Sequence, residues 1–401
     1  MTSTLITNIA ELTTVDAENR TLHGAAVVID GEDIAWIGSA DAAPAADGQY
    51  DAGGRAVLPG WVDSHTHLVF AGDRSAEFEA RMAGQSYAAG GISVTMDATG
   101  AATDSQLEAL VRQRIAGAVA GGTTYLETKT GYGLSLDEET RHAQLLGRLH
   151  RAGELDAVTY LGAHLVPPGQ DAESYTDLVA GPMLDAVRDH VQWADVFCEH
   201  GAFDEHQSRR VLEAARDVGL GLRVHGNQLG PGPGITLATE LGAASVDHAN
   251  YVNDGDLAAL AATWERWDPG SRTGAPGTVA TCLPACDLST RQPLAPGRRL
   301  LEAGVEIALA SNCNPGTSYT SSMNFCVTTA VLQMELSLSE AIRAGTYGGA
   351  LALHAQHRVG SAEVGKRADL HVLDAPSAIH LAYRPGMPLT HAVYRAGRRV
   401  H

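Results

Sequence analysis

From residue 57 onward, hydrophobic and polar positions follow one recurring pattern along the chain. A short apolar or β-branched run ends in a polar residue, a Gly-rich or Pro-rich loop follows, and a longer stretch comes next. In the longer stretches, such as residues 105–118 and 207–216, apolar positions recur every three or four residues, which predicts amphipathic helices. The polar ends of the eight apolar runs are His65 with His67, Glu127 to Lys129, His164, Glu199, His225, His248, Pro284 and Asn312. Alternation of this kind predicts parallel strands with crossover helices, and eight repeats predict a closed (β/α)8 barrel of the TIM type.

The two ends of the chain follow a different pattern. Residues 25–38 are typical of a two-stranded ribbon that turns at Asp30-Gly31, and residues 365–374 and 391–400 have a similar strand-like pattern. We therefore expect a small β-sandwich domain built from residues 1–56 and 364–401, flanking a barrel of residues 57–363.

Composition and charge narrow the classes of partner. The formal net charge of −19 disfavours nucleic acid and anionic membranes as partners, and a small anionic substrate would need a local cation. The five cysteines contain no C-x-x-C pair, which favours a reducing cytoplasm over a disulfide framework. The sequence has no basic leader followed by an apolar stretch and no run of eighteen apolar residues, so we expect a cytoplasmic protein without a membrane span.

Histidines supply the first candidate chemistry. Side chains alternate along an extended segment, so His65 and His67 point the same way and can hold one metal ion together. In a barrel the carboxyl ends of the strands form one rim, where His164, His225 and His248 would join this pair. For any one of these residues, an incidental core or surface histidine is an equally good interpretation. For the whole set, accidental convergence at one rim is a poor interpretation.

Longer motifs strengthen this interpretation. They occupy residues 65–78, 127–134, 161–164, 195–199, 246–248 and 313–317. In this combination the chain resembles the amidohydrolase superfamily, and almost end to end it resembles the branch that opens the imidazolone ring in histidine breakdown. The resemblance implies hydrolysis of the ring amide of 4-imidazolone-5-propanoate to N-formimidoyl-L-glutamate by a protein that is commonly a homodimer.

The resemblance also implies a site for one divalent metal ion, Zn or Fe. Its ligands would be His65, His67, His225 and an aspartate at the end of the eighth strand, where this chain has Asn312. The ion would polarise the ring carbonyl and lower the pKa of the attacking water. An amide oxygen can coordinate, but it brings no negative charge and cannot take the proton from that water.

The asparagine therefore predicts an impaired or substrate-trapping variant. Two alternatives stay open, namely a natural relative that acts on another small carboxylated heterocycle, and a non-catalytic homologue that only binds a ligand.

The remaining site residues also come from the resemblance. His248 would orient or protonate beside the water, with an outer supporting role as the alternative, and Gln228 would contact the imidazolone ring. Arg74 would bind the propanoate with two parallel hydrogen bonds unless it forms a surface ion pair. The other expected substrate contacts are Tyr132, His164, Asn314, Gly316 and Thr317, the last three in a segment that is otherwise good turn chemistry.

Other features point to a structural role or to divergence from the family. A lysine–glutamate pair bracing the barrel mouth is a plain interpretation of Lys129 and Glu199. Cys282 and Cys286 are expected to be inert buried thiols. Residues 87–93 are shorter than the corresponding family segment, and Gly100 stands where arginine is common, so one pocket wall differs from the family pattern.

Overall fold

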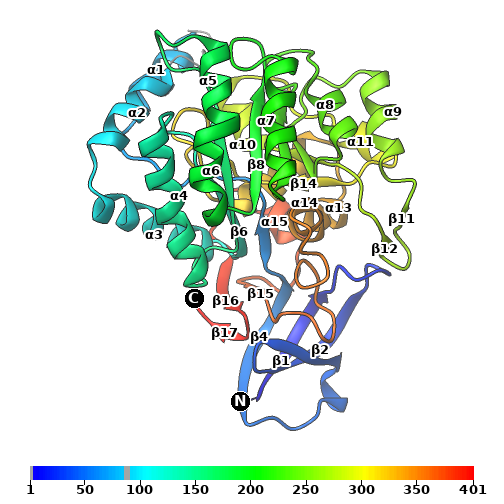
Figure 1. Ribbon diagram of the computed structural model, residues 1–401. Helices are drawn as coiled ribbons and strands as arrows, with labels where there is room; N and C mark the ends of the chain where they lie inside the picture. Colours follow the sequence, from blue (N-terminus) through cyan, green and yellow to red (C-terminus); the bar gives the residue numbers. More distant parts are fainter. Residues whose placement is uncertain (1–2, 85–90) are drawn as a thin grey trace.

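The computed structural model describes residues 3–84 and 91–401, and its centre is an eight-stranded parallel sheet rolled into a barrel (Figure 1). Neighbouring strands follow chain order, as expected when each strand is joined to the next by a right-handed crossover. The barrel strands are β5 (Trp61–Asp63), β6 (Thr123–Lys129), β7 (Ala157–Ala163), β8 (Trp193–Cys198), β9 (Gly221–Gly226), β10 (Ser245–His248), β13 (Val279–Cys282) and β14 (Ile307–Leu309). The predicted (β/α)8 barrel is confirmed.

The barrel closes at its carboxyl rim, between the segments that follow β5 and β14. Asn312 N donates to the His65 carbonyl at 3.0 Å, and His67 N donates to the Asn312 carbonyl at 3.1 Å. Thr66 and Asn312 thus form a parallel bridge beyond the ends of the two strands. The backbone that seals the barrel therefore belongs to three of the predicted site residues.

Helices form the outer layer around the strands (Figure 1). The predicted helical stretches at 105–118 and 207–216 lie within α3 (Asp104–Ala120) and α7 (Glu205–Asp217), and reciprocal capping boxes, Thr103 with Gln106 and Asp204 with Gln207, set where these helices begin. The other α-helices are α1 (Ser75–Met82), α2 (Ile92–Ala101), α4 (Leu136–Arg151), α5 (Ala172–Leu178), α6 (Leu184–Val187), α8 (Gly234–Leu241), α9 (Asp254–Ala262), α10 (Pro284–Thr290), α11 (Gly297–Glu302), α12 (Met323–Gln333), α13 (Leu338–Arg343), α14 (Gly349–Ala352) and α15 (His380–Tyr383). Within residues 3–84 and 91–401, no helix combines the length and the apolar character needed to cross a bilayer.

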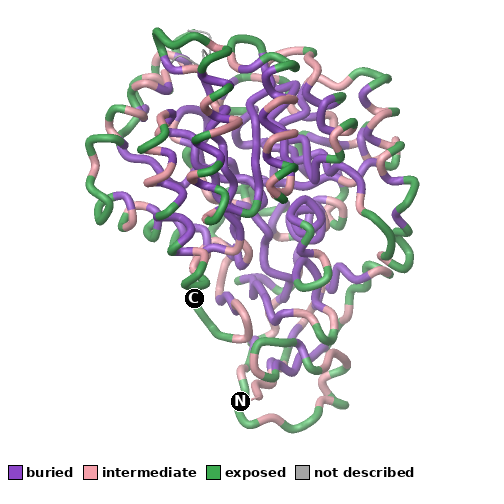
Figure 2. Tube along the Cα trace, viewed as in Figure 1, coloured by how far each residue is buried: buried purple, intermediate pink, exposed green. Residues whose placement is uncertain are grey.

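Burial follows the two layers. The barrel strands and the inward faces of the helices are buried, while the exposed residues lie on the outer faces and loops (Figure 2). The main apolar cluster fills the space between strands and helices, with Leu107 and Val111 of α3 and Val211 and Leu212 of α7 as examples. At roughly 25 cal/mol per Å² of buried apolar surface, this layer supplies the dominant favourable term in folding.

A second sheet is built from both ends of the chain, as expected. Its strands form one mixed seven-stranded sheet in the order β17, β16, β15, β4, β1, β2, β3. They are β1 (Ser3–Thr13), β2 (Thr21–Asp30), β3 (Asp33–Ser39), β4 (Gly48–Pro59), β15 (Leu370–Leu373), β16 (Thr390–Arg395) and β17 (Arg398–Arg399). β2 and β3 pair antiparallel through Asp30 and Asp33, which confirms the predicted hairpin. The division at residues 56/57 and 363/364 stays a proposal, and β4 runs across the first of these positions.

The small sheet is fixed beneath the amino ends of the barrel strands. Asp156, just before β7, binds two arginines of the small sheet, Arg367 at 2.9 Å and Arg395 at 2.8 Å. The same two arginines donate to the carbonyl of Thr124 in β6. Because the small sheet lies at the amino ends, the opposite rim is left for the histidines.

We predict that Asp156→Ala loosens this attachment. The substitution leaves Arg395 without its carboxylate and leaves Arg367 with Asp369 alone, so the free energy of unfolding should fall by about 3 kcal/mol. Urea denaturation followed by circular dichroism measures the effect. Asp185→Ala is the control, because its ion pair with Arg188 is exposed and should contribute little. Equal midpoints for the two variants would contradict the assigned role of Asp156.

Candidate active site

Five histidines converge at the carboxyl rim of the barrel. The Nε2 atoms of His65 and His67 are 3.2 Å apart, and the ring centroids of His65 and His225 are separated by 4.5 Å. His248 lies 5.4 Å from His225 between centroids, and His164 stacks on His67 at 5.6 Å. One ligand atom from each of His65, His225 and His248 lies within 4.8 Å of the others. The structure thus brings together all five imidazoles that the sequence places at strand ends.

The backbone at this rim is strained. His248 ends β10 and Ala249 follows it, with φ of 83° and 47°, and Asn312 and Cys313 follow β14 with φ of 71° and 32°. Non-glycine residues at positive φ are uncommon and cost energy, so they persist where the surrounding structure forces them and concentrate at functional sites. This strain turns the side chains that follow the two strands toward the barrel axis.

Carboxylates behind the histidines fix how the rings are oriented. Asp247 Oδ2 lies 2.7 Å from His65 Nδ1, and Asp195 Oδ2 lies 3.0 Å from His225 Nδ1. A carboxylate at Nδ1 selects the tautomer that leaves Nε2 with a lone pair. Burial lowers the pKa of His65 to about 3 and the pKa of His67 well below its usual value, so both rings are neutral at physiological pH. Neutral imidazole is the form that binds a metal ion.

Unpartnered polar atoms show that this set of residues fits a cation. His225 Nε2 and His248 Nδ1 are buried without a hydrogen-bond partner, and neither residue has an interaction with the part of the chain left undescribed. Asn312 Nδ2 donates to Thr317 Oγ1 at 2.7 Å, which leaves Asn312 Oδ1 buried without a partner as well. Imidazole nitrogens together with an amide oxygen suit a divalent ion such as zinc or ferrous iron.

A narrow recess lies beside the histidines. It contains four of the predicted substrate residues and has a volume of about 20 Å³, room for roughly one water molecule. Its lining residues are Arg74, Ile92, Tyr132, His164, Leu165, Phe197 and Asn314. His164 Nδ1 bonds to the Gly131 carbonyl at 2.7 Å, and burial lowers its pKa to about 4, so this ring is neutral too.

Arg74 is buried in this recess and already carries an ion pair. Its side chain is 5% exposed, and its Nε and Nη2 atoms bind the Glu77 carboxylate at 2.6 to 2.8 Å. In this structure Arg74 therefore forms an ion pair, although not on the surface, and its contact with the propanoate stays a prediction. Arg74 Nη1 lies against Gly316, where any Cβ atom would overlap it. A side chain at position 316 would therefore displace the Arg74 guanidinium.

That loop is also held from the other side. Asn314 Oδ1 accepts from Gly316 N at 2.8 Å, and Asn314 and Ser318 exchange two backbone hydrogen bonds. Arg81 Nη1, from α1, donates to the Gly316 carbonyl at 3.0 Å. The segment is the turn that its composition predicts, and it lies at the predicted substrate site.

Gln228 and Glu199 lie together at the rim. Glu199 Oε2 accepts from the backbone N atoms of Gln228 and Leu229 at 2.8 and 3.0 Å, and Gln228 Nε2 lies 3.6 Å from Cys286 Sγ. Lys129 does pair with a glutamate, but at 3.1 Å its partner is Glu127. The predicted brace between Lys129 and Glu199 is therefore wrong, because Lys129 points into the barrel interior.

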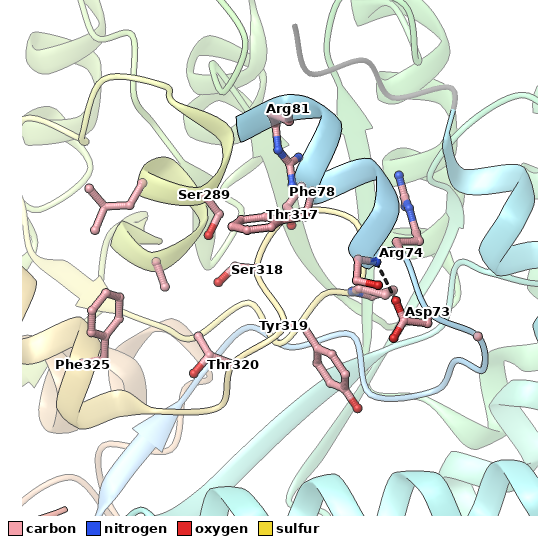
Figure 3. A pocket seen from close by; sticks show the side chains of 15 residues that line it. Asp73, Arg74, Phe78, Arg81, Ser289, Thr317, Ser318, Tyr319, Thr320 and Phe325 are labelled. Carbon is pink, nitrogen blue, oxygen red and sulfur yellow. Dashed lines mark hydrogen bonds between the residues drawn. The ribbon is translucent and has the colours of Figure 1, made fainter. Parts of the chain in front are cut away.

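A larger cavity of about 490 Å³ lies outside the recess and shares Arg74 with it. Figure 3 shows α1 beside this cavity, with Phe78 and Arg81 extending from the helix and Tyr319 and Phe325 on the opposite side. The segment 87–93, expected to alter one pocket wall, lies largely outside the described residues.

Sequence reasoning gave no role to several buried charges beneath the rim. Asp195, Asp247 and Arg223 are fully buried in barrel strands, and Asp63 is held by Ser311 N and Oγ. A signal was present, because each of these residues is an acid or a base within a short run that also carries apolar side chains. Only the fold shows which histidine each carboxylate touches.

Comparison with known proteins agrees with this architecture. The family model described as "Amidohydrolase family" matches residues 56–399. A protein of Micrococcus luteus named imidazolonepropionase is 71% identical over 399 residues, with 100% of both chains covered. One of Paenarthrobacter aurescens with the same name is 69% identical, covering 99% of this chain and 98% of its own. The chain belongs to the amidohydrolase family and, within it, to the imidazolonepropionases.

Solved structures with the same fold are more distant in sequence. A triazine hydrolase variant superposes with a TM-score of 0.74 at 18% identity, covering 100% of this chain and 95% of its own. An adenosine deaminase from Xanthomonas campestris with bound zinc gives 0.73 at 18% identity, covering 99% and 92%. At this identity the likeness shows the fold alone.

One buried acid near the site should make stability depend on pH. Burial raises the pKa of Asp287 to about 8, whereas in the unfolded chain it is near 3.8. At pH values between these two pKa values, the folded protein holds a proton that the unfolded chain has released. The free energy of unfolding therefore falls as pH rises through this range, until the carboxyl ionises in the fold at about pH 8. We predict that Asp287→Asn reduces this loss.

Thermal unfolding at pH 6 and pH 9 measures the difference. The decrease in midpoint between these two values should be smaller in Asp287→Asn than in the unmodified protein. Asp254→Asn, at a carboxylate that is 97% exposed, should show the unmodified pH dependence. An unchanged decrease in Asp287→Asn would mean that this carboxyl is ionised in the fold.

Proposed function

We propose that the protein hydrolyses the ring amide of 4-imidazolone-5-propanoate to N-formimidoyl-L-glutamate. The observation that carries the proposal is the convergence of five imidazoles at the carboxyl rim, four of them buried, beside a recess that contains an arginine. Full-length identity of about 70% to proteins named imidazolonepropionase supports the same reaction. Hydrolysis of a cyclic amide with an anionic tail needs both features. The imidazoles would hold an ion that polarises the ring carbonyl, and the arginine would hold the carboxylate.

The proposed ligands of one divalent ion, Zn or Fe, are His65, His67, His225 and the amide oxygen of Asn312. A bound ion would act as a Lewis acid toward the ring carbonyl and would lower the pKa of water. The neutral rings and the unpartnered Asn312 Oδ1 support this assignment.

Protein groups around the ion would bind and orient the substrate. His248, whose pKa burial holds well below its usual value, has a free Nδ1 that can accept a proton or a hydrogen bond. Arg74 would hold the propanoate, with Tyr132 and His164 on the same recess. Gln228, Asn314, Gly316 and Thr317 complete the proposed contacts at the rim. Because the recess holds only about 20 Å³, its walls must move apart to admit the ring.

Asn312 bears on how fast the reaction runs. A side chain without a carboxylate cannot take the proton of the attacking water, which led us to expect an impaired or trapped variant. The comparisons give no support for impairment, since relatives with 71% and 69% identity carry the enzyme's name. His248 lies in the same cluster with an unpartnered Nδ1 atom, so it can orient the attacking water by accepting a hydrogen bond. The effect of Asn312 on turnover stays a prediction.

We also propose that the protein works as a homodimer in the cytoplasm, as the family resemblance and the five free, buried cysteines favour.

A substitution series at position 312 tests the ion site. Zinc affinity should decrease from Asn312→Asp to the unmodified protein to Asn312→Ala, because the carboxylate adds charge and alanine removes the ligand. Chelation should abolish hydrolysis, and zinc or iron should restore it. Isothermal titration with zinc and an assay of N-formimidoyl-glutamate measure both effects. Hydrolysis absent from the unmodified protein and from Asn312→Asp would favour the binding homologue.

A change at Arg74 tests the substrate. Arg74→Met removes a charge-assisted contact worth about 1.5–3 kcal/mol, so KM for the propanoate should rise roughly 10-fold to 100-fold. The KM for an imidazolone without the carboxylate should hardly change. Arg112→Met is the control, because that arginine is 50% exposed on α3. An unchanged KM for the propanoate would favour a different heterocyclic substrate.

A further inference from the structure

A cluster of five charged side chains lies inside the barrel directly below the histidines. Glu127, Lys129, Asp195, Arg223 and Asp247 are each 0% exposed. We call them the interior charge cluster. Burying charges is costly unless they are paired and hydrogen-bonded, so such a cluster needs a physical reason.

Lys129 is the centre of this cluster. Its Nζ atom lies 2.9 Å from Asp195 Oδ2, 3.1 Å from Glu127 Oε1 and 3.7 Å from Asp247 Oδ2. These three carboxylates come from three different strands, β8, β6 and β10. An ammonium group has three hydrogens on one atom, so it can face three carboxylates at once.

Two of these carboxylates contact the proposed metal ligands. The Asp247 oxygen that faces Lys129 is the atom bonded to His65 Nδ1 at 2.7 Å. The Asp195 oxygen that faces Lys129 lies 3.0 Å from His225 Nδ1. Lys129 therefore contacts each of two imidazoles, from different parts of the barrel, through a single intervening carboxylate.

Repulsion between the carboxylates explains why the cation matters. The ligand oxygens of Asp195 and Asp247 lie within 4.8 Å of each other and of His225. Two like charges at this distance in a dry interior repel strongly, and they would turn away from each other without a cation between them. Rotation of Asp247 removes the hydrogen-bond partner of His65, and rotation of Asp195 removes the carboxylate that lies 3.0 Å from His225 Nδ1.

The presence of a lysine rather than an arginine at position 129 supports the same role. The chain contains only two lysines, Lys129 and Lys366, among 28 basic residues. Arg223, the other interior cation, spreads its contacts over Ser64 O, Ala352 O and Asp247. A planar guanidinium presents its donors in a fork and cannot place one atom between three carboxylates. A lysine at position 129 therefore meets a geometric need that arginine does not.

We propose that Lys129 is a positioning residue that fixes the His65 and His225 rings through Asp247 and Asp195, so that both Nε2 atoms face one ion. This inference rests on the ion site of the proposed function. Lys129 does not touch the substrate, and its effect reaches the reaction through the orientation of the ligands.

Zinc affinity of the full-length protein tests the proposal. In Lys129→Met the dissociation constant for zinc, measured by competition with a chelating dye, should rise about 10-fold to 100-fold, the usual effect of removing an outer support of a metal ligand. With cobalt in place of zinc, the visible absorption bands should shift, because they report ligand geometry. The fall in kcat should persist at saturating zinc. Lys129→Arg should not restore the affinity.

Two further variants separate positioning from general damage. Lys366→Met removes the second lysine of the chain, which is partly buried and pairs with Glu363, and should leave the zinc constant and the cobalt spectrum unchanged. Lys129→Met with Asp195→Asn keeps the net charge of the interior charge cluster and provides a folded variant where Lys129→Met alone is unstable. If both single variants fold, the zinc affinity of the double variant should be higher than the sum of the two single effects predicts. If Lys129→Met does not fold, the double variant should bind zinc as tightly as Asp195→Asn does.

The outcomes are distinct. A Lys129→Met protein that binds zinc within twofold of the unmodified protein, with an unchanged cobalt spectrum, would overturn the positioning role. Strictly additive effects of the Lys129 and Asp195 substitutions would overturn it as well. Failure of the unmodified protein to bind any divalent ion would instead overturn the ion site of the proposed function.

Discussion

The structure depends on contacts between buried carboxylates and imidazoles. Asp247 and Asp195 hold the Nδ1 sides of His65 and His225, and this frees the opposite nitrogens for one shared centre. Such contacts are stable in a dry interior only if cations neutralise the carboxylates. This explains why the barrel contains Lys129 and Arg223, although an apolar core would cost less free energy of desolvation. The buried charges inside the barrel therefore support the histidines at its mouth.

Closure of the barrel and construction of the site use the same backbone. The Asn312 backbone seals the cylinder through hydrogen bonds to residues 65 and 67, and its side-chain amide donates to Thr317. The positive φ angles of His248 and Asn312 occur where strands end and side chains must turn inward. The seven-stranded sheet is fixed at the other end through Asp156, so it supports the strands without covering the rim.

The sequence predicted much of the candidate site. The eight apolar runs, the two helical stretches and the hairpin at Asp30-Gly31 were confirmed, because burial imposes their periodicity locally. Convergence of the five histidines followed from the rule that parallel strands end at one rim. Pairings between distant side chains did not follow. Lys129 was matched with Glu199 but pairs with Glu127, and the sequence did not identify Glu77 as the ion-pair partner of Arg74.

The sequence by itself determined the strand and helix pattern, the small sheet from both termini and the residues able to act as ligands, since these depend on local periodicity and side-chain chemistry. Tertiary structure alone decided which carboxylate supports which imidazole, that Asn312 Oδ1 is left without a partner, and that the recess is narrow. The physical reason is distance along the chain. Residues 65 and 247, or 129 and 195, meet only when the barrel closes, and no local pattern encodes the angle at which their side chains then face each other.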